Sequence, residues 1–194
     1  MMKKKFRNNK WTVVYTPEDG ARIDRLNFDG FDLLTTEPEK FKLPETDFGQ
    51  FETRPVYGYD DCFPSVDYSI YPGLDWNIPD HGELCWLKWQ VDETKDRLIF
   101  SVRSKVLPVI FKREMHFADD VLSWNFHVIN EGQETLPFLH VMHPLMPLRE
   151  VEKFDLPAFG PVFDERQQKY LNFTKPDEIE NFLLNQPAGT EQML

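Results

Sequence analysis

The sequence predicts an all-β protein, an antiparallel β-sandwich formed as a single domain over residues 1–194. Apolar and polar residues alternate with a period of two along most of the chain, which is the pattern of strands that bury one face. The 15 prolines and the 14% aromatic content disfavour helices and favour strands. A chain of 194 residues can bury a sizeable core as one domain.

The predicted strands follow one another with short polar turns between them, which indicates an antiparallel meander. In the N-terminal third, a turn at Asp29-Gly30 separates two of these strands. In the central part, the segment 92–96 reads as a turn between strands 84–91 and 97–104. In the first of these two strands, Leu84 and Trp86 should share one face. The other predicted strands are 10–17, 21–28, 31–36, 109–117, 122–130 and 136–144.

Two regions depart from the strand pattern. Residues 37–80 are rich in proline, aspartate and aromatic side chains and are expected to form long, packed loops. Residues 174–184 predict a short helix within a tail spanning 166–194, because Thr174 can cap it, Pro176 suits the first turn, and acidic residues follow directly.

The net charge of −11 makes a nucleic-acid-binding surface improbable. No stretch has the apolar length of a membrane span, and no apolar segment of a secretory signal follows the N-terminal lysines, so the predicted location is the cytoplasm. Cys62 and Cys85 are too few and too isolated to predict a disulfide framework.

Few chemical motifs are present. His81 and Glu83 form the H-x-E that opens the zinc deaminase signature, but no P-C-x-x-C follows to complete it. A metal shared by His81, His140 and His143 would require a bend after the last strand, since His140 and His143 point to opposite faces of a regular strand. We therefore expect no metal and no other cofactor, and acid–base chemistry by histidines and carboxylates remains.

Four separated segments, in this order, resemble the galactose mutarotase (aldose 1-epimerase) superfamily over residues 10–165. The segments are RPVYGYDDCFPSVD (54–67), PDHGELCWLKWQV (79–91), LPVIFKREMHF (107–117) and NEGQETLPFLHVMHPLMPL (130–148). The resemblance implies a galactose mutarotase-like antiparallel β-supersandwich, an isomerase of carbohydrate metabolism whose small-molecule partner is a hexose.

The resemblance also implies roles for particular residues. His143 matches the histidine that protonates the sugar ring oxygen, and His81 matches the histidine that contacts the sugar. Arg54 is the nearest match to an arginine that contacts the sugar, and Asp60 and Asp61 occupy the loop position of further polar contacts. Glu83, two residues after His81, is expected on the same strand face as His81, and Trp86 is expected to continue that face with a ring that could lie against a pyranose. Arg54 and Arg113 could serve a sugar phosphate.

One part of the family pattern has no match. The catalytic base of the family is a glutamate near the C-terminus, and Glu178, Glu180 and Glu191 lack its surrounding motif, so the fold is expected to be C-terminally incomplete. Two functions therefore stay open: a mutarotase, and an inactive carbohydrate-binding domain without the base. A structural β-domain without ligand is a third interpretation. Met193 and Leu194 resemble the start of another strand, and an open sheet edge predicts a homo-oligomer or a covering partner chain, unless residues 176–184 shield that edge.

Overall fold

A computed structural model describes residues 1–37, 47–147, 159–164 and 167–186. The chain divides into two compact units, Met1–Met146 and Pro147–Leu194. Glu191, which is not assigned the role of the base, and Met193 and Leu194, which are expected to start a strand, lie outside the described residues, as does part of the predicted loop 37–80.

The first unit contains a six-stranded antiparallel sheet. Its main path joins neighbouring strands in the order β1-β2-β3-β5-β12, and β4 also pairs with β3. Strand β2 shows why the sheet forms here: Trp11, Val13 and Tyr15 are buried, while the residues between them are half-buried. The strands are β1 (Lys4–Asn8), β2 (Trp11–Thr16), β3 (Arg22–Phe28), β4 (Phe31–Asp32), β5 (Tyr59–Cys62) and β12 (Val141–Pro144).

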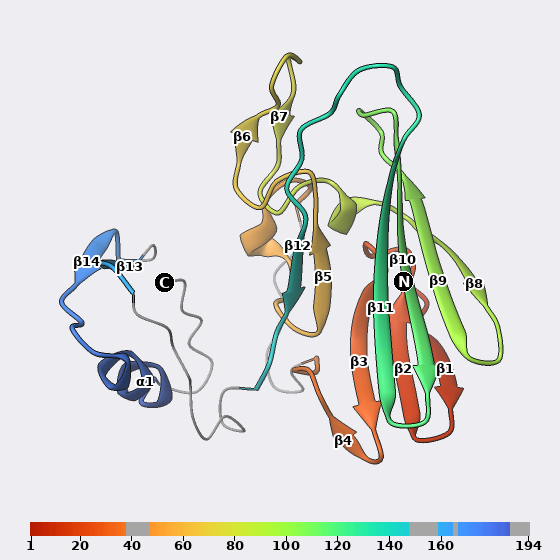
Figure 1. The fold of residues 1–194 in the computed structure, drawn as a ribbon, viewed down its shortest axis with the longest axis horizontal. Coiled ribbons are helices and arrows are strands. Elements are labelled where there is room, and N and C mark those ends of the chain that lie inside the picture. Colours follow the sequence, from red (N-terminus) through yellow and green to blue (C-terminus); the bar gives the residue numbers. More distant parts are fainter. Residues whose placement is uncertain (38–46, 148–158, 165–166, 187–194) are drawn as a thin grey trace. The chain divides into compact units, whose positions relative to one another are not determined.

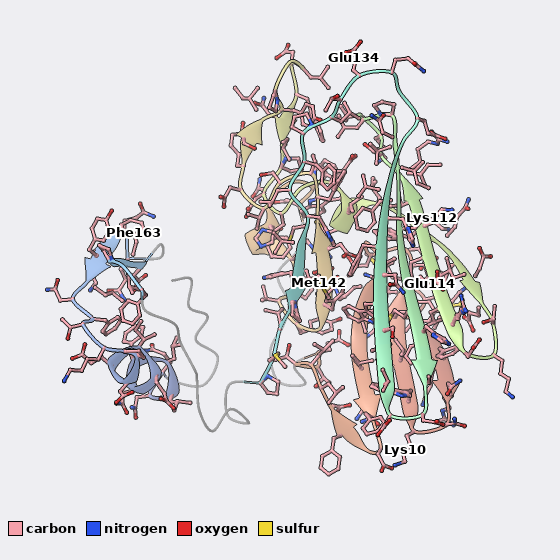
Figure 2. The ribbon with its side chains drawn as sticks, in the orientation of Figure 1. Lys10, Lys112, Glu114, Glu134, Met142 and Phe163 are labelled. Atoms are coloured by element: carbon pink, nitrogen blue, oxygen red, sulfur yellow. The ribbon has the colours of Figure 1, made fainter. Side chains whose placement is uncertain are left out.

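The second sheet of this unit is a four-stranded antiparallel meander in the order β11-β10-β9-β8. From Val109 to Phe117, strand β10 alternates between buried and half-buried residues, and Figure 2 labels Lys112 and Glu114 among its half-buried ones. The pairing of Arg113 with Phe100 and Phe126 confirms the predicted hairpins. The strands are β8 (Gln90–Glu93), β9 (Arg97–Arg103), β10 (Val109–Ala118) and β11 (Val121–Asn130) (Figure 1).

A single apolar core joins side chains from both sheets. Tyr15 of β2 meets Phe100 of β9 edge to face, with ring centroids 5.2 Å apart. Full burial of one such side chain contributes roughly 1.5–3 kcal/mol. The predicted all-β antiparallel fold is confirmed.

The predicted strand 84–91 is wrong in its first half. Leu84–Trp86 forms a 3-10 turn, η2, and strand β8 begins only at Gln90. The turn is held by local bonds, since the Trp86 N–H donates to the Glu83 carbonyl (3.0 Å) and the Leu87 N–H donates to the Leu84 carbonyl (3.2 Å). Both Leu84 and Cys85 are buried, so alternation does not distinguish two faces here.

The prediction of loops over 37–80 is wrong at Tyr59–Cys62, which forms β5 between β3 and β12. The described residues of this region also contain three further short elements. They are the 3-10 turn η1 (Phe51–Thr53) and the two-residue strands β6 (Ser69–Ile70) and β7 (Asn77–Ile78), which pair with each other.

The second unit contains a small hairpin and the predicted helix. The hairpin pairs β13 (Val162–Asp164) with β14 (Lys169–Leu171), and the helix α1 spans Pro176–Leu184. The helix start differs from the prediction, in which Thr174 capped the helix. Instead, the Glu178 carboxylate accepts the backbone N–H groups of Thr174 (2.6 Å) and Lys175 (3.1 Å). No helix in the described part of the chain is long and apolar enough to cross a bilayer.

Candidate active site at a histidine pair

The pairing of β5 with β12 places three polar side chains on one face of the first sheet. His143 lies directly opposite Asp60, and Val141 lies directly opposite Cys62. Because paired residues share a face and alternate residues return to it, Asp60, Cys62 and His143 point to the same side. Figure 1 shows β12 alongside β5.

The turn Pro79–Gly82 brings a second histidine to this face. His81 has a φ of 61° and Gly82 a φ of 73°, both in the left-handed region. A Cβ at Gly82 would lie only 2.1 Å from the carbonyl oxygen of Phe63, so the close approach of the turn to the end of β5 requires glycine. The His81 N–H donates to the Val66 carbonyl (2.7 Å), which fixes the strained histidine in place.

Aromatic contacts orient the two imidazoles. The ring of Phe51 stacks on His81 with centroids 3.4 Å apart and planes inclined by 5°, and it meets His143 edge-on at 5.9 Å. The imidazole centroids of His81 and His143 are 5.0 Å apart. The Asp80 carboxylate lies 3.0 Å from Nδ1 of His81. His81 is only 8% exposed, whereas His143 is half-buried, so the pair borders solvent on the His143 side.

A buried thiol completes the group. One ligating atom from each of Cys62, His81 and His143 lies within 4.8 Å of the other two. Burial first, and then the carboxylates of Asp60, Asp61 and Asp80, raise the pKa of the Cys62 thiol far above its ordinary value. By itself the thiol is therefore neutral at physiological pH and a poor nucleophile.

Arg54 is hydrogen-bonded to three groups next to the site. Its Nη1 donates to Asp19 Oδ1 (2.9 Å) and to the Cys85 carbonyl (2.5 Å), and its Nη2 donates to Asp60 Oδ1 (3.2 Å). The guanidinium also lies 5.0 Å from the ring of Trp86. Arg54 is only 3% exposed, so the structure gives it the role of holding Asp60 and Trp86 in position.

Comparisons with known proteins agree on the architecture. No family model matches the chain. Its sequence is 31% identical over 129 residues to the uncharacterised protein YphB of Escherichia coli (strain K12), a match that covers 63% of this chain and 43% of YphB. Among solved structures, the Slr1438 protein of Synechocystis sp. PCC 6803 superposes with a TM-score of 0.65 and 17% identity, covering 89% of this chain and 64% of that one.

Two further solved structures carry descriptive names. A candidate aldose 1-epimerase of Escherichia coli K12 has a TM-score of 0.55 and 21% identity, covering 76% of this chain and 52% of that one. A galactose mutarotase-like protein of Clostridium acetobutylicum has a TM-score of 0.53 and 19% identity, covering 76% of this chain and 51% of that one. The chain has the galactose mutarotase-like fold. In these comparisons it spans 43% to 64% of the length of the matched protein.

Within this mutarotase-like fold, the predicted residues separate into two groups. His81, His143 and Asp60 lie together, with Arg54 packed between Asp60 and Trp86. Asp61 and Glu83 lie elsewhere, and for these two the predicted sugar contact is corrected.

Asp61 points to the other face of β5, into the core, and is fully buried. Its Oδ2 accepts Nη1 of Arg113 (2.6 Å), and its Oδ1 accepts the hydroxyl of Tyr59 (2.6 Å) and lies 3.0 Å from Nε2 of His140. Arg113 is equally buried and also donates to the Ala21 carbonyl (2.6 Å), so neither member of this pair is available to a sugar or a sugar phosphate. The same contacts remove His140 from the histidine pair, as strand alternation predicted.

Glu83 is buried beside the turn at Ser104. Its carboxylate accepts the Ser104 hydroxyl and the Lys105 N–H (3.1 Å). Burial raises the pKa of Glu83, and these hydrogen bonds partly oppose the increase. The expected strand face running from His81 through Glu83 to Trp86 does not form, because the turn Pro79–Gly82 and η2 replace the strand.

Three site residues were missed from the sequence: Phe51, Cys62 and Asp80. Strand alternation could have identified Cys62, two positions after Asp60, but Phe51 required the three-dimensional position of η1.

A second missed feature is a groove of about 700 Å³ beside Trp86. Its cationic lining comprises Lys88, Arg103, Lys105 and Lys112.

Proposed function

We propose that this chain binds a hexose at the face defined by Phe51, His81 and His143, and that it interconverts the α and β anomers as an aldose 1-epimerase does. The observation that carries the proposal is the pair of imidazoles held 5.0 Å apart by an aromatic ring, in a galactose mutarotase-like fold.

The proposed reaction is an acid–base ring opening. Protonated His143 donates its proton to the ring oxygen, a base removes the proton of the anomeric hydroxyl, and the C1–O5 bond breaks to give the open-chain aldehyde. Rotation about C1–C2 presents the other face of the carbonyl. The hydroxyl at C5 then attacks C1, and the two protons return. A positioned acid or base of this kind typically contributes roughly 10²- to 10⁴-fold to the rate.

His81 is assigned to binding. Asp80 at its Nδ1 orients the ring, which leaves Nε2 toward the substrate side. Phe51 is buried against His81 and holds that imidazole in place, whereas the half-buried Trp86 has an indole ring of the kind that a pyranose can lie against.

We assign no described carboxylate as the base. Asp60 accepts Arg54, and Asp80 is hydrogen-bonded to His81, so both nearby acids already have positioning roles. A binding function without turnover is therefore the second candidate, and it makes a different prediction in the same experiment.

The experiment follows freshly dissolved α-glucose, α-galactose and their 6-phosphates by polarimetry, and measures binding of the same sugars by calorimetry. His127→Ala is the matched control, because His127 is an exposed histidine on β11. Turnover above the buffer rate that His127→Ala keeps and His143→Ala loses supports the mutarotase. Saturable binding without turnover supports the binding function, and a chain that neither binds nor turns over any of these sugars refutes both.

A further inference from the structure

The group formed by Cys62, His81 and His143 has a composition that acid–base catalysis does not require. The three residues come from separate segments, namely β5, the turn Pro79–Gly82 and β12, yet one ligating atom from each lies within 4.8 Å of the others. A sugar site needs the imidazoles, but it has no evident use for a fully buried thiol next to them.

The donor set is specific in chemical terms. One thiolate and two imidazoles suit borderline-soft divalent ions such as zinc, whereas magnesium and calcium require oxygen ligands. Zinc binds sulfur at about 2.3 Å and imidazole nitrogen at about 2.0–2.1 Å, so the ligand atoms of a tetrahedral site lie about 3.3–3.6 Å apart. The observed spacing of at most 4.8 Å is larger by about 1.2–1.5 Å, a difference that rotation of the Cys62 and His143 side chains toward the fixed His81 can close.

Surrounding groups favour a cation. The Asp80 carboxylate lies 3.0 Å from Nδ1 of His81, which leaves Nε2 as the ligating nitrogen and reproduces the carboxylate–histidine–metal arrangement of zinc proteins. Asp60 shares the face of Cys62, but its charge is already balanced by Arg54, so the Asp80 carboxylate is the group that favours the ion. The stacked Phe51 ring restricts the rotation of His81.

We propose that Cys62, His81 and His143 form a binding site for one borderline-soft divalent transition-metal ion of the zinc class, with a fourth position open to solvent or to a ligand. On binding, the Cys62 thiol releases its proton to solvent, and the thiolate sulfur and the two imidazole nitrogens coordinate the ion. No electron transfer is involved.

The site has a regulatory consequence that, unlike the binding itself, rests on the proposed function. An ion held by His81 and His143 occupies the nitrogens that the sugar and its proton need. Zinc and sugar should therefore exclude each other, and zinc should inhibit mutarotation.

The direct test is a titration of the whole chain with cobalt(II), followed by absorption spectroscopy and by competition with zinc. We expect one equivalent to bind with a thiolate-to-cobalt charge-transfer band, and we expect zinc but not magnesium or calcium to remove it. The matched variants are Cys62→Ser against Cys85→Ser, since Cys85 is an equally buried free cysteine outside the group. Asp80→Asn removes the negative charge at Nδ1 of His81 and should weaken binding of the metal ion roughly 10- to 100-fold.

Cys62→Ser should abolish the charge-transfer band and weaken zinc binding more than about 100-fold, because loss of an outer-shell partner alone costs roughly 10- to 100-fold. Cys85→Ser should keep both. If Cys62→Ser fails to fold by near-ultraviolet circular dichroism, His81→Gln and His143→Gln replace it, with His127→Gln as their control. Absence of a stoichiometric cobalt complex in the wild-type chain, or unchanged binding in the folded ligand variants, would overturn the proposal.

Metal binding and mutarotase activity, measured on the same preparation, distinguish the two proposals. A cobalt complex in a chain without mutarotase activity would support the metal site and refute only the enzyme. Mutarotase activity in a chain that binds no zinc would do the reverse.

Discussion

The two faces of strand β5 carry adjacent aspartates with opposite surroundings. On the inner face, Asp61 is fully buried and both of its oxygens are occupied, by Arg113 on one side and by Tyr59 and His140 on the other. On the outer face, Asp60 and Cys62 are also buried, but they accompany the half-buried His143. The inner group is closed and can only hold the two sheets together, whereas the outer group borders solvent at the half-buried His143.

This difference shows how one strand serves stability and chemistry at once. The pleat sends successive side chains to opposite sides, so a single step along the chain moves a carboxylate from the border of the site into the core. In a low-dielectric interior a charge is tolerated only with its partners in place, which explains why Asp61 is surrounded by donors.

The largest expected effect is on turnover, at the outer face. We expect His143→Gln to lower kcat for mutarotation by roughly 10²- to 10⁴-fold with little change in KM, because proton donation matters chiefly in the transition state. Polarimetry at several sugar concentrations measures both constants. The free energy of unfolding should change little, and full turnover in the folded variant would contradict the assignment of the acid.

At the inner face, the expected effect is on stability. Asp61→Asn leaves the Arg113 guanidinium buried without a counter-charge, which should lower the free energy of unfolding by about 3–5 kcal/mol. Urea denaturation measures the loss. The matched control is Glu131→Gln, which breaks an exposed pair with Arg103 and should cost about 0–1 kcal/mol. Similar losses in the two variants would show that the buried Asp61–Arg113 pair contributes no more to stability than an exposed pair.

A smaller effect separates the two histidines from each other. His81→Ala should raise KM by about 10-fold, because a ground-state hydrogen bond of this kind contributes about 1–2 kcal/mol. The same steady-state measurements give the value. A larger fall in kcat than in His143→Gln would reverse the roles given to the pair.

The smallest expected effect is on the pH dependence of the free energy of unfolding, and it concerns Glu83. This carboxylate is buried like Asp61, but it accepts a hydroxyl and an N–H group instead of an ion pair. Burial raises the pKa of Glu83 above its ordinary 4.5, so the folded chain holds this proton more tightly than the unfolded chain does. The resulting stabilisation is complete below the ordinary pKa and is lost as the pH rises through the raised pKa. Relative to Glu83→Gln, the wild type should therefore lose stability as the pH rises.

Urea denaturation across a pH series measures this difference, and titrations common to both proteins cancel. Glu114→Gln provides the control, since Glu114 is a half-buried carboxylate paired with Arg97 on the face of β10 that alternates with the core. A wild type that gains stability over Glu83→Gln as the pH rises would show that hydrogen bonding outweighs burial.

Much of the fold followed from the sequence, because alternation is a direct record of which strand face is buried. It located β9, β10 and β11 and even their hairpin pairing. It misplaced residues 84–91, where Leu84 and Cys85 are both buried inside a 3-10 turn that alternation cannot recognise. Propensity alone located α1, since Pro176 and the acids after it satisfy the helix start.

The site was predicted less completely, for a physical reason. Resemblance supplied His81 and His143, and the structure brings them together. The sequence predicts Asp60 and Asp61 in a loop, so nothing in it indicated that they point to opposite faces of a strand, or that Asp61 enters the core to meet the distant Arg113. Self-association at an open sheet edge stays a prediction, which light scattering with size exclusion can test.

The pairing of β5 with β12 also has a consequence for how the chain folds. His140 and Asp61 are 79 positions apart, whereas β10 and β11 meet through a tight turn. Closing a long loop costs entropy before any contact compensates for it, so hairpins form early and distant pairings form late. We expect the meander to be present before β12 docks, and the histidine face to be the last part of the first unit to assemble. A nascent chain would therefore form its apolar core before it brings His81 and His143 together.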